Sequence, residues 1–273
     1  MKFHVVTLFP EMILKAAEIG VVGSARKAGL IDIEVVNPRE FTKDVHHSVD
    51  DRPFGGSDGM LMTPEPVANA IEKMQNLISS GSMRTIHLSP RGQLLTDAKL
   101  RELAKFDRLI LVASRYAGLD QRVINTCIDE EISIGDYVLS GGEIAALTLI
   151  DGVSRLLPGV LGNQVSEVNE SFAPGSELLE QPQFTRPREW RGQAVPQALL
   201  SGHHIEIAKW NLALRILVTA ARRPELLGRV KKEDLLSARK FFEKLTEMER
   251  QTCGLETSGL MEERLAKALE RGS

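Results

Sequence analysis

The sequence has few cysteines and no long apolar segment. Cys127 and Cys253 are the only two, and neither belongs to a Cys-x-x-Cys or Cys/His cluster, so neither a zinc site nor a disulfide framework is predicted. No apolar run reaches the roughly 18 residues of a membrane-spanning helix. The N-terminal segment also lacks the apolar region and small-residue cleavage site of a signal peptide. We therefore expect a cytoplasmic protein that makes no membrane contact.

The charge of the chain is nearly balanced but unevenly distributed. The formal net charge of the 273 residues is −3, which by itself argues against nucleic-acid binding. Between Arg186 and Lys232, however, ten Lys or Arg residues face only three acidic ones, which leaves a local excess of seven positive charges. Such an excess is typical of a polyanion-binding surface. A solvated basic helix surface is the alternative.

Strand and helix patterns alternate over the first 160 residues. Strand-like runs occur at 3–8, 31–36, 85–88, 108–112 and around 132–134, and helical patterns lie around 12–27, 65–78, 97–105 and 121–126. This alternation predicts βαβ units and a mostly parallel sheet covered on both faces. Such sheets bind ligands in the crevice beyond the carboxyl ends of their strands.

The pattern changes after this region. From Pro158 to Pro187, prolines and glycines interrupt the chain, as is typical of a functional loop or a linker. After Pro196 the pattern is helical, with apolar residues that repeat at steps of three and four: Ile205, Ala208, Leu212 and Ile216. We predict an α/β domain over 1–160, a linker over 161–175 and a helical domain over 176–273.

Three glycine-bearing segments follow predicted strands: LSPRG (88–92), SRYAGLD (114–120) and SIGDYVLSGGE (133–143). Glycine lets a backbone approach a ligand closely, and N–H groups at a helix start need partners. We expect the three segments to form one pocket suited to a nucleoside, although the third could be a simple strand-to-helix turn. The helix after it should bury one apolar face: Ile144, Leu147, Ile150, Val153 and Leu157.

Two polar clusters could carry chemistry. Glu170 lies in the predicted linker and Arg155 ends the preceding helix, so together they could supply a base and an anion stabiliser; solvated linker charges are the alternative. The second cluster contains His46, His47 and Asp50. It has no HExxH-like spacing, so we predict no metal site and prefer a polar loop that contacts a nucleic-acid base.

Taken together, the motifs resemble one known family. VDDRPFGG, LSPRG, RYAGLD, IGDYVLSGGE, DGVSRLLPGVLG, QFTRP, LLSGHH and RRPELL occur in this order. From Met1 to about Arg250 the chain is similar to the bacterial tRNA (guanine-N1-)-methyltransferases of the SPOUT superfamily. These enzymes methylate the guanine on the 3′ side of the anticodon.

The resemblance implies a fold, a cofactor and partners. It implies a SPOUT-type α/β domain with a mostly parallel sheet and a deep trefoil knot, followed by a flexible linker and a small helical C-terminal domain. It further implies an obligate homodimer with its active site at the subunit interface, the tRNA anticodon stem-loop as partner, and S-adenosylmethionine as methyl donor. The residues matched to the cofactor loops are Leu88, Ser89, Pro90, Gly92, Ser114, Tyr116, Gly118, Ile134, Gly135, Asp136, Tyr137, Val138, Leu139, Gly141 and Gly142.

The resemblance also assigns catalytic and RNA-binding candidates. Arg155 matches the residue that stabilises charge on guanine O6, and Glu170 stands where the family usually has an aspartate as base. Ala117 stands where the family usually has a glutamate. Mg²⁺ is plausible by resemblance, although the sequence shows no dedicated cage. The RNA-binding candidates are Asp50, Arg186, Ser201, His203 and His204, with a core position as the alternative for His204.

Two rival functions stay open from the sequence. One is a SPOUT methyltransferase that acts on a different RNA position and shares the cofactor pocket. The other is a catalytically inactive RNA-binding relative, because Glu170 and Ala117 both depart from the family pattern.

Overall fold

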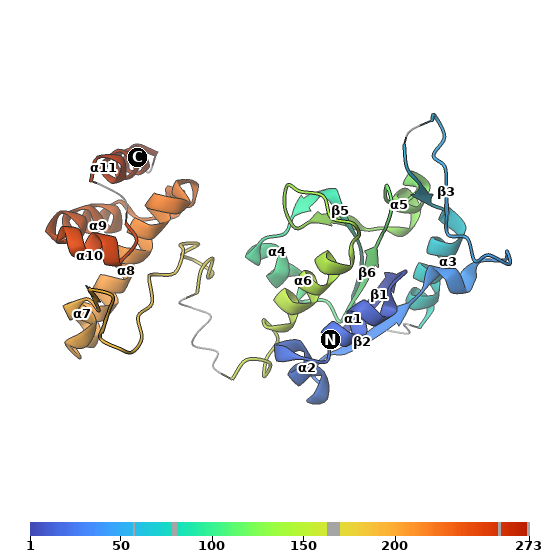
Figure 1. Cartoon of the computed structure of the whole chain (residues 1–273), viewed down its shortest axis with the longest axis horizontal. Helices are drawn as coiled ribbons and strands as arrows, with labels where there is room; N and C mark the ends of the chain where they lie inside the picture. The colour runs from blue at the N-terminus through green and yellow to red at the C-terminus, as the bar shows by residue number, and fades with distance from the viewer. Residues whose placement is uncertain (57, 78–80, 163–169, 256–257, 272–273) are drawn as a thin grey trace. The chain divides into compact units, whose positions relative to one another are not determined.

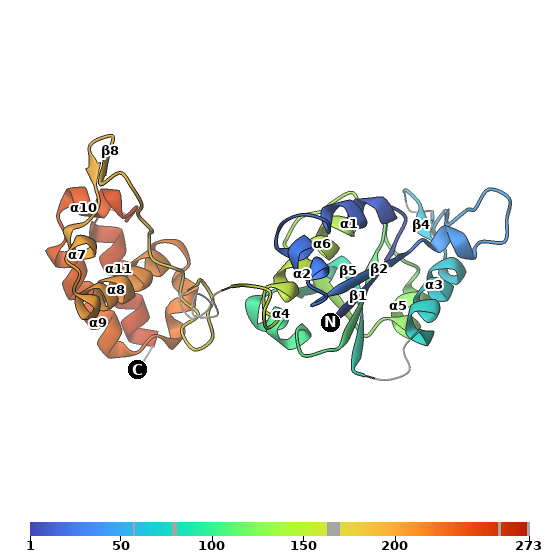
Figure 2. The same ribbon diagram turned by 90° about the horizontal axis from the view of Figure 1, so that it is seen from below.

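The computed structural model describes residues 1–56, 58–77, 81–162, 170–255 and 258–271 (Figures 1 and 2). The chain divides into two compact units, Met1–Gly162 and Asn163–Ser273. Of the predicted linker 161–175, residues 163–169 lie outside the described part.

The first unit is built on a five-stranded parallel sheet with the order β2-β1-β6-β5-β7. The prediction of a mostly parallel sheet is therefore confirmed. A short antiparallel pair, β3 and β4, lies outside this sheet. The strand bounds are β1 Lys2–Thr7, β2 Asp32–Val36, β3 Asp50–Asp51, β4 Leu61–Met62, β5 Met83–Leu94, β6 Arg108–Ala113 and β7 Glu130–Ser133.

Helices cover both faces of this sheet. Their bounds are α1 Pro10–Ala16, α2 Gly20–Lys27, α3 Pro64–Asn76, α4 Asp97–Leu103, α5 Gln121–Cys127 and α6 Glu143–Ser154, with a 3₁₀ turn, η1, at Pro38–Phe41. The single helical pattern predicted around 12–27 is wrong, because the chain forms two helices there. Gly20, at the start of α2, has a φ of 67°, a left-handed conformation that interrupts a continuous helix.

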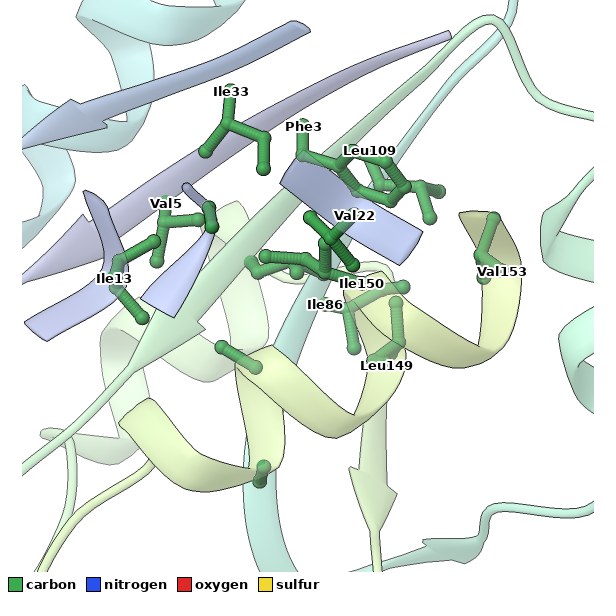
Figure 3. Packing of buried hydrophobic residues seen from close by; sticks show 14 of the residues in the cluster. Phe3, Val5, Ile13, Val22, Ile33, Ile86, Leu109, Leu149, Ile150 and Val153 are labelled. Atoms are coloured by element: carbon green, nitrogen blue, oxygen red, sulfur yellow. The ribbon is translucent and has the colours of Figure 1, made fainter. Parts of the chain in front are cut away.

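Side chains alternate between the two faces of the central strands. On β6, Leu109 and Leu111 join one buried cluster with α1, α2, α4 and α6, whereas Ile110 and Val112 join the other with α3 and α5. Figure 3 shows the first cluster, in which Phe3 of β1 packs near helix α6. Burial on both faces explains the continuous apolar strand sequences.

Helix α6 buries a slightly different face from the one predicted. Ile150 and Val153 are fully buried as expected, but Ile144 is 48% exposed. Ala146 and Leu149 take its place in the core. The small alanines let the helix lie close to the sheet, so the larger Ile144 remains outside.

Strand β5 is longer than the predicted run 85–88, because the chain leaves the ladder and returns to it. Leu88 and Gln93 both pair with Ile132 of β7, so residues 89–92 form an excursion between two paired segments. A Cβ placed on Gly92 would lie 2.4 Å from the carbonyl carbon of Glu131. Glycine is therefore required where the excursion rejoins the sheet.

The second unit is helical. Its elements are the hairpin β8 Glu189–Trp190 and β9 Gln193–Ala194, the helices α7 Gln197–Leu200, α8 His204–Arg222, α9 Lys232–Lys244, α10 Glu247–Thr252 and α11 Ser258–Arg271, and the 3₁₀ turn η3 Pro224–Arg229. The central helix α8 packs against α9, α11 and η3. This arrangement confirms a helical C-terminal region.

The predicted helical repeat lies within α8, but only its last residue is buried. Ile216 is 1% exposed, whereas Ile205 is 74% exposed and Ala208 and Leu212 are also exposed. The core is formed by the neighbouring stripe, which includes Trp210 and Leu214. The helix carries apolar residues on two faces, and the stripe with the larger side chains is the one that is covered.

Gly92 offers a test of the excursion in β5. We expect Gly92→Ala to destabilise the first unit by about 2 kcal/mol or more, because the new Cβ meets backbone atoms that cannot rotate away. Calorimetric unfolding measures the effect. Gly228→Ala is the control, because its Cβ would meet no atom within 4 Å. Equal thermal stability of the two variants would contradict this account of Gly92.

Candidate active site

The three glycine-bearing segments of the first unit meet at one pocket of about 220 Å³. Every residue predicted to bind the cofactor lines this pocket except Gly92 and Asp136. Gly92 acts in strand packing instead, and Asp136 lies in the third segment without lining the pocket. The lining residues are His87, Leu88, Ser89, Pro90, Ser114, Tyr116, Ala117, Gly118, Ile132, Ser133, Ile134, Gly135, Tyr137, Val138, Leu139, Gly141, Gly142 and Ala145.

Five lining residues were not named as cofactor contacts: His87, Ala117, Ile132, Ser133 and Ala145. Ala117 and Ser133 lie within the predicted segments, and a margin of one residue would have added His87 and Ile132. Ala145 lies in the first turn of α6, two residues beyond the third segment.

Close backbone contact holds the third segment against the second. The Gly142 N–H donates to the Ser114 carbonyl oxygen over 2.9 Å. A Cβ on Gly142 would lie 2.8 Å from the Cα of Ala113, and a Cβ on Gly141 would lie 2.3 Å from the Arg115 Nε. These two glycines are therefore needed for the segments to touch.

The second segment turns sharply beside the pocket. Tyr116 has a φ of 59°, which is uncommon for a bulky residue, and Gly118 has a φ of 107°. The Ala117 N–H donates to the Met60 carbonyl oxygen at 2.8 Å, next to strand β4. Backbone strain of this kind is concentrated at functional sites.

Asp120 ends the second segment and starts α5. Its carboxylate accepts a hydrogen bond from the Arg122 backbone N–H at 2.8 Å and another from its Nη2 at 2.7 Å. The Arg122 guanidinium holds the pKa of Asp120 at about 2. The carboxylate therefore stays ionised as the cap of this helix.

A buried carboxylate joins three chain segments beneath the pocket. Glu143, at the start of α6, is only 1% exposed. Its Oε1 accepts a hydrogen bond from the Thr7 hydroxyl at 2.9 Å, and its Oε2 lies 2.9 Å from the Arg115 Nε. The guanidinium of Arg115 also lies over the ring of Phe9, 4.3 Å from its centroid.

A second polar chain reaches the pocket wall itself. The Nε2 of His87 lies 2.9 Å from the Ser114 Oγ, and its Nδ1 lies 2.9 Å from Oε1 of Glu131. His87 is 2% exposed, and burial lowers the pKa of its imidazole. The neutral ring is therefore the favoured form near neutral pH.

The two candidate catalytic residues belong to different units. Arg155 is half-buried directly after α6, where its N–H donates to the Asp151 carbonyl oxygen at 3.1 Å. Glu170 is half-buried in the second unit, where its carbonyl oxygen accepts a hydrogen bond from Arg215 at 3.4 Å. Each is described only within its own unit.

The chain was compared with known proteins. The family model described as tRNA (Guanine-1)-methyltransferase TrmD matches residues 1–229. The chain belongs to this family. A protein of Aeromonas salmonicida (strain A449), named tRNA (guanine-N(1)-)-methyltransferase, is 54% identical over 224 residues, which are 82% of this chain and 89% of the relative.

Other relatives of the same name are similarly close. The protein of Shewanella woodyi (strain ATCC 51908 / MS32) is 52% identical over 223 residues, with 82% of this chain and 89% of the relative covered. The protein of Marinomonas sp. (strain MWYL1) is 49% identical over 227 residues, with 83% and 89% covered. The TrmD family match thus includes the pocket segments and the first part of the helical unit.

The RNA-binding candidates of this TrmD family member lie mostly on the surface. Arg186, Ser201, His203 and His204 are exposed on the second unit, so the core position considered for His204 is wrong. Asp50 is half-buried in β3 of the first unit. Their exposure leaves them accessible to a ligand.

Arg215 corrects the interpretation of the basic stretch. It is the one buried residue among the ten Lys and Arg residues counted there, at 8% exposure. Its Nη2 donates to the Ser176 Oγ at 2.8 Å as well as to the carbonyl of Glu170. Arg215 therefore holds the segment that carries Glu170, and the other nine basic residues form the exposed charge.

Two kinds of feature are absent from the described residues. Within 1–56, 58–77, 81–162, 170–255 and 258–271, no helix has the length and hydropathy needed to cross a bilayer. The same residues contain no group of three or more His, Cys, Asp or Glu side chains arranged to hold a metal ion.

Glu143 allows the buried contact beneath the pocket to be tested. We expect Glu143→Ala to destabilise the first unit by about 3 kcal/mol, because it leaves Arg115 and Thr7 without their shared carboxylate. Urea denaturation measures the loss. The control is Glu11→Ala, which removes an exposed ion pair with Lys15 and should change stability little. A Glu143→Ala variant as stable as this control would refute the role of the buried carboxylate.

Proposed function

We propose that the protein transfers a methyl group from S-adenosylmethionine to N1 of the guanine on the 3′ side of the tRNA anticodon. The observation that carries this function is the pocket, in which three segments matched to the family's cofactor loops come together. Membership of the TrmD family and identity of about half with relatives named tRNA (guanine-N(1)-)-methyltransferase support the reaction.

The pocket suits S-adenosylmethionine by its shape and composition. Side chains at Gly141 and Gly142 would clash with neighbouring atoms, so their backbone closes the pocket wall. Leu88, Ile134 and Leu139 offer apolar surface to a base, and Ser89 and Ser114 offer hydroxyls. When bound, S-adenosylmethionine supplies an electrophilic methyl group on a positively charged sulfur.

The chain must supply the removal of the guanine N1 proton. This proton is less acidic than a carboxylic acid by about five pK units, which corresponds to about 7 kcal/mol. We assign Glu170 as the proton acceptor and Arg155 as the cation that stabilises negative charge developing on O6. A preorganised donor at a developing oxyanion contributes about 3–4 kcal/mol, and alignment of the reactants contributes the remainder.

Two departures from the family pattern bear on this assignment. Glu170 extends the usual aspartate by one methylene, and a misplacement of about 1 Å can reduce a rate about a hundredfold. Ala117 lines the pocket where the family usually has a glutamate, so the pocket lacks that carboxylate. The contact of Arg215 with the Glu170 backbone supports a defined position for the longer side chain.

The exposed basic residues of the second unit support tRNA binding. Nine Lys and Arg side chains between Arg186 and Lys232 would contact phosphates and give affinity that falls with salt. We assign recognition of the anticodon loop to Asp50, Arg186, Ser201, His203 and His204, which would contact an unstacked base and its neighbours. A tRNA substrate also implies a cytoplasmic location.

We extend the proposal to the family's finer architecture. From its membership of the TrmD family we infer that the pocket segments form the deep trefoil knot of this fold. Of the predicted linker 161–175, residues 163–169 lie outside the described part of the chain. The described residues do not fit a Mg²⁺ cage of side chains. We therefore derive no step that uses this ion.

An exposed apolar surface supports the obligate homodimer with its active site at the interface. Phe9, Met12 and Ile144 are all exposed. The Phe9 N–H donates to the Thr7 hydroxyl that contacts Glu143, and Ile144 follows Glu143 directly on α6. Aromatic residues and methionine are enriched at protein interfaces. Burial of this surface in a partner subunit would explain why three large apolar side chains face solvent.

Methyl transfer is tested directly with labelled S-adenosylmethionine and a tRNA transcript that carries guanine on the 3′ side of its anticodon. The expected product is 1-methylguanosine at that position, detected by nuclease digestion and mass spectrometry. Methylation of another nucleotide would indicate a different RNA specificity. Tight tRNA binding with no label transfer would indicate an inactive relative and overturn the proposed function.

In the same assay we expect Glu170→Gln to reduce turnover at least a hundredfold, because an amide cannot accept the N1 proton. Affinity for S-adenosylmethionine, measured by calorimetry, should stay nearly unchanged. Glu189→Gln is the matched control, since Glu189 is exposed in the β8–β9 hairpin of the same unit. An active Glu170→Gln enzyme would remove Glu170 from the role of base.

The homodimer is tested by placing a charge in the exposed apolar surface. Ile144→Glu should convert a dimer to a monomer in sedimentation velocity, because an interface core disfavours an unpaired carboxylate. Leu77→Glu, at the end of α3, is the control that should remain dimeric. A wild-type monomer, or a dimeric Ile144→Glu variant, would contradict this interface.

A further inference from the structure

A hydrogen-bond chain crosses three neighbouring strands at the pocket. His87 on β5 stands opposite Glu131 on the adjacent strand β7, and Ser114 directly follows β6 on the other side. The distances are 2.9 Å from Nδ1 of His87 to Glu131 and 2.9 Å from Nε2 to the Ser114 Oγ. His87 and Ser114 both line the pocket and are both buried.

The protons in this chain can be assigned from its charges. The carboxylate of Glu131 forms an ion pair with the guanidinium of Arg91, 3.5 Å away. An ionised carboxylate only accepts hydrogen bonds, so His87 must donate through Nδ1–H. In a neutral ring Nε2 is then an acceptor, and the Ser114 hydroxyl donates its single proton to it.

This assignment fixes what Ser114 presents to a ligand. Its proton is directed at His87, so only the oxygen lone pairs remain for a molecule in the pocket. We propose that His87 is a positioning residue that sets the Ser114 hydroxyl as a hydrogen-bond acceptor for an N–H or O–H group of S-adenosylmethionine; this inference rests on the proposed function of the pocket.

Protonation of His87 should reverse the direction of the hydrogen bond between His87 and Ser114. An imidazolium has an N–H at both ring nitrogens, so Nε2 would donate to the Ser114 Oγ and the hydroxyl proton would turn toward the pocket. The ligand's donor would then meet another donor. The charged groups near His87 are Glu131 and Arg91, and Tyr116 and Tyr137 are the other titratable side chains on the pocket wall.

The sign of the pH dependence follows from burial. Desolvation lowers the pKa of His87 below its ordinary value of 6.5, and this exceeds the opposing influence of Glu131. Ligand affinity should therefore be constant from about pH 8 to about pH 6.5 and should fall below that, as the ring becomes charged.

The test measures binding to the full-length protein by calorimetry between about pH 8 and about pH 5. The probes are S-adenosylmethionine and 5′-methylthioadenosine. The second probe lacks the amino-acid group, so titration of that group cannot contribute to its pH profile. For wild-type protein we expect the affinity for S-adenosylmethionine to fall about tenfold at the acid end. If the affinity for 5′-methylthioadenosine falls in the same way at acid pH, the hydrogen-bond donor to Ser114 lies in the adenosine half of the ligand. If only the affinity for S-adenosylmethionine falls, the donor lies in the amino-acid half.

Three variants separate a positioning role of His87 from general damage to the pocket. Ser114→Ala should lose about tenfold in affinity near neutral pH and should lose the pH dependence, because the switched hydroxyl is gone. Ser89→Ala, which removes another hydroxyl from the pocket wall, should keep the wild-type shape of the pH profile. His87→Phe should weaken binding in the wild-type background but not in the Ser114→Ala background, since His87 acts only through Ser114.

The results distinguish failure of the positioning role of His87 from failure of the proposed function. A wild-type protein that binds S-adenosylmethionine with a flat pH profile overturns the role of His87 and leaves the proposed function standing. A pH dependence that persists in Ser114→Ala also overturns it. A wild-type protein that binds neither probe at any pH overturns both the positioning role and the proposed function.

Discussion

The contact of Glu143 with Arg115 and Thr7 is the constraint on which the pocket depends. Glu143 is almost completely buried at the first turn of α6, where a carboxylate is also favoured by the helix dipole. It joins the end of β1, the segment after β6 and the third glycine-bearing segment. Because an unpaired buried charge costs several kcal/mol, these segments can separate only at a large free-energy cost. The pocket wall is therefore formed before any ligand binds.

Close main-chain contacts at three glycines also hold the pocket segments together. Gly92, Gly141 and Gly142 each occupy a place where a Cβ would overlap a neighbouring atom. Two of them bring the third segment against the second, and the other returns the β5 excursion to β7. At these glycines the segments meet through main-chain groups, which have few alternative conformations, while side chains such as Leu88 and Leu139 form the rest of the wall. A wall of this kind suits a ligand that must be held in one orientation for in-line transfer.

The sequence predicts this site well where the signal is local. The segments 88–92, 114–120 and 133–143 were identified because glycine, proline and hydroxyl residues follow apolar strands, and they do line one pocket. The contribution of His87 depends on strand order and register, which place Glu131 and Ser114 on either side of it, and no local pattern contains that information. The burial of α8 depends on tertiary packing for a related reason. Both stripes of that helix have helical spacing, and only the packing of α9 and α11 selects the one through Trp210.

The pocket also limits where the base can come from. No Asp or Glu is among the described residues that line it, and its one imidazole is committed to Glu131 and Ser114. Burial lowers the pKa of that imidazole, which makes it a weaker proton acceptor. The acceptor for the guanine N1 proton must therefore lie outside the cofactor wall. Glu170 meets this requirement, since its backbone is held by the buried Arg215 in a unit that also carries the exposed basic residues. Under the proposed function, the first unit would hold the methyl donor, and the second would bring the RNA together with the base.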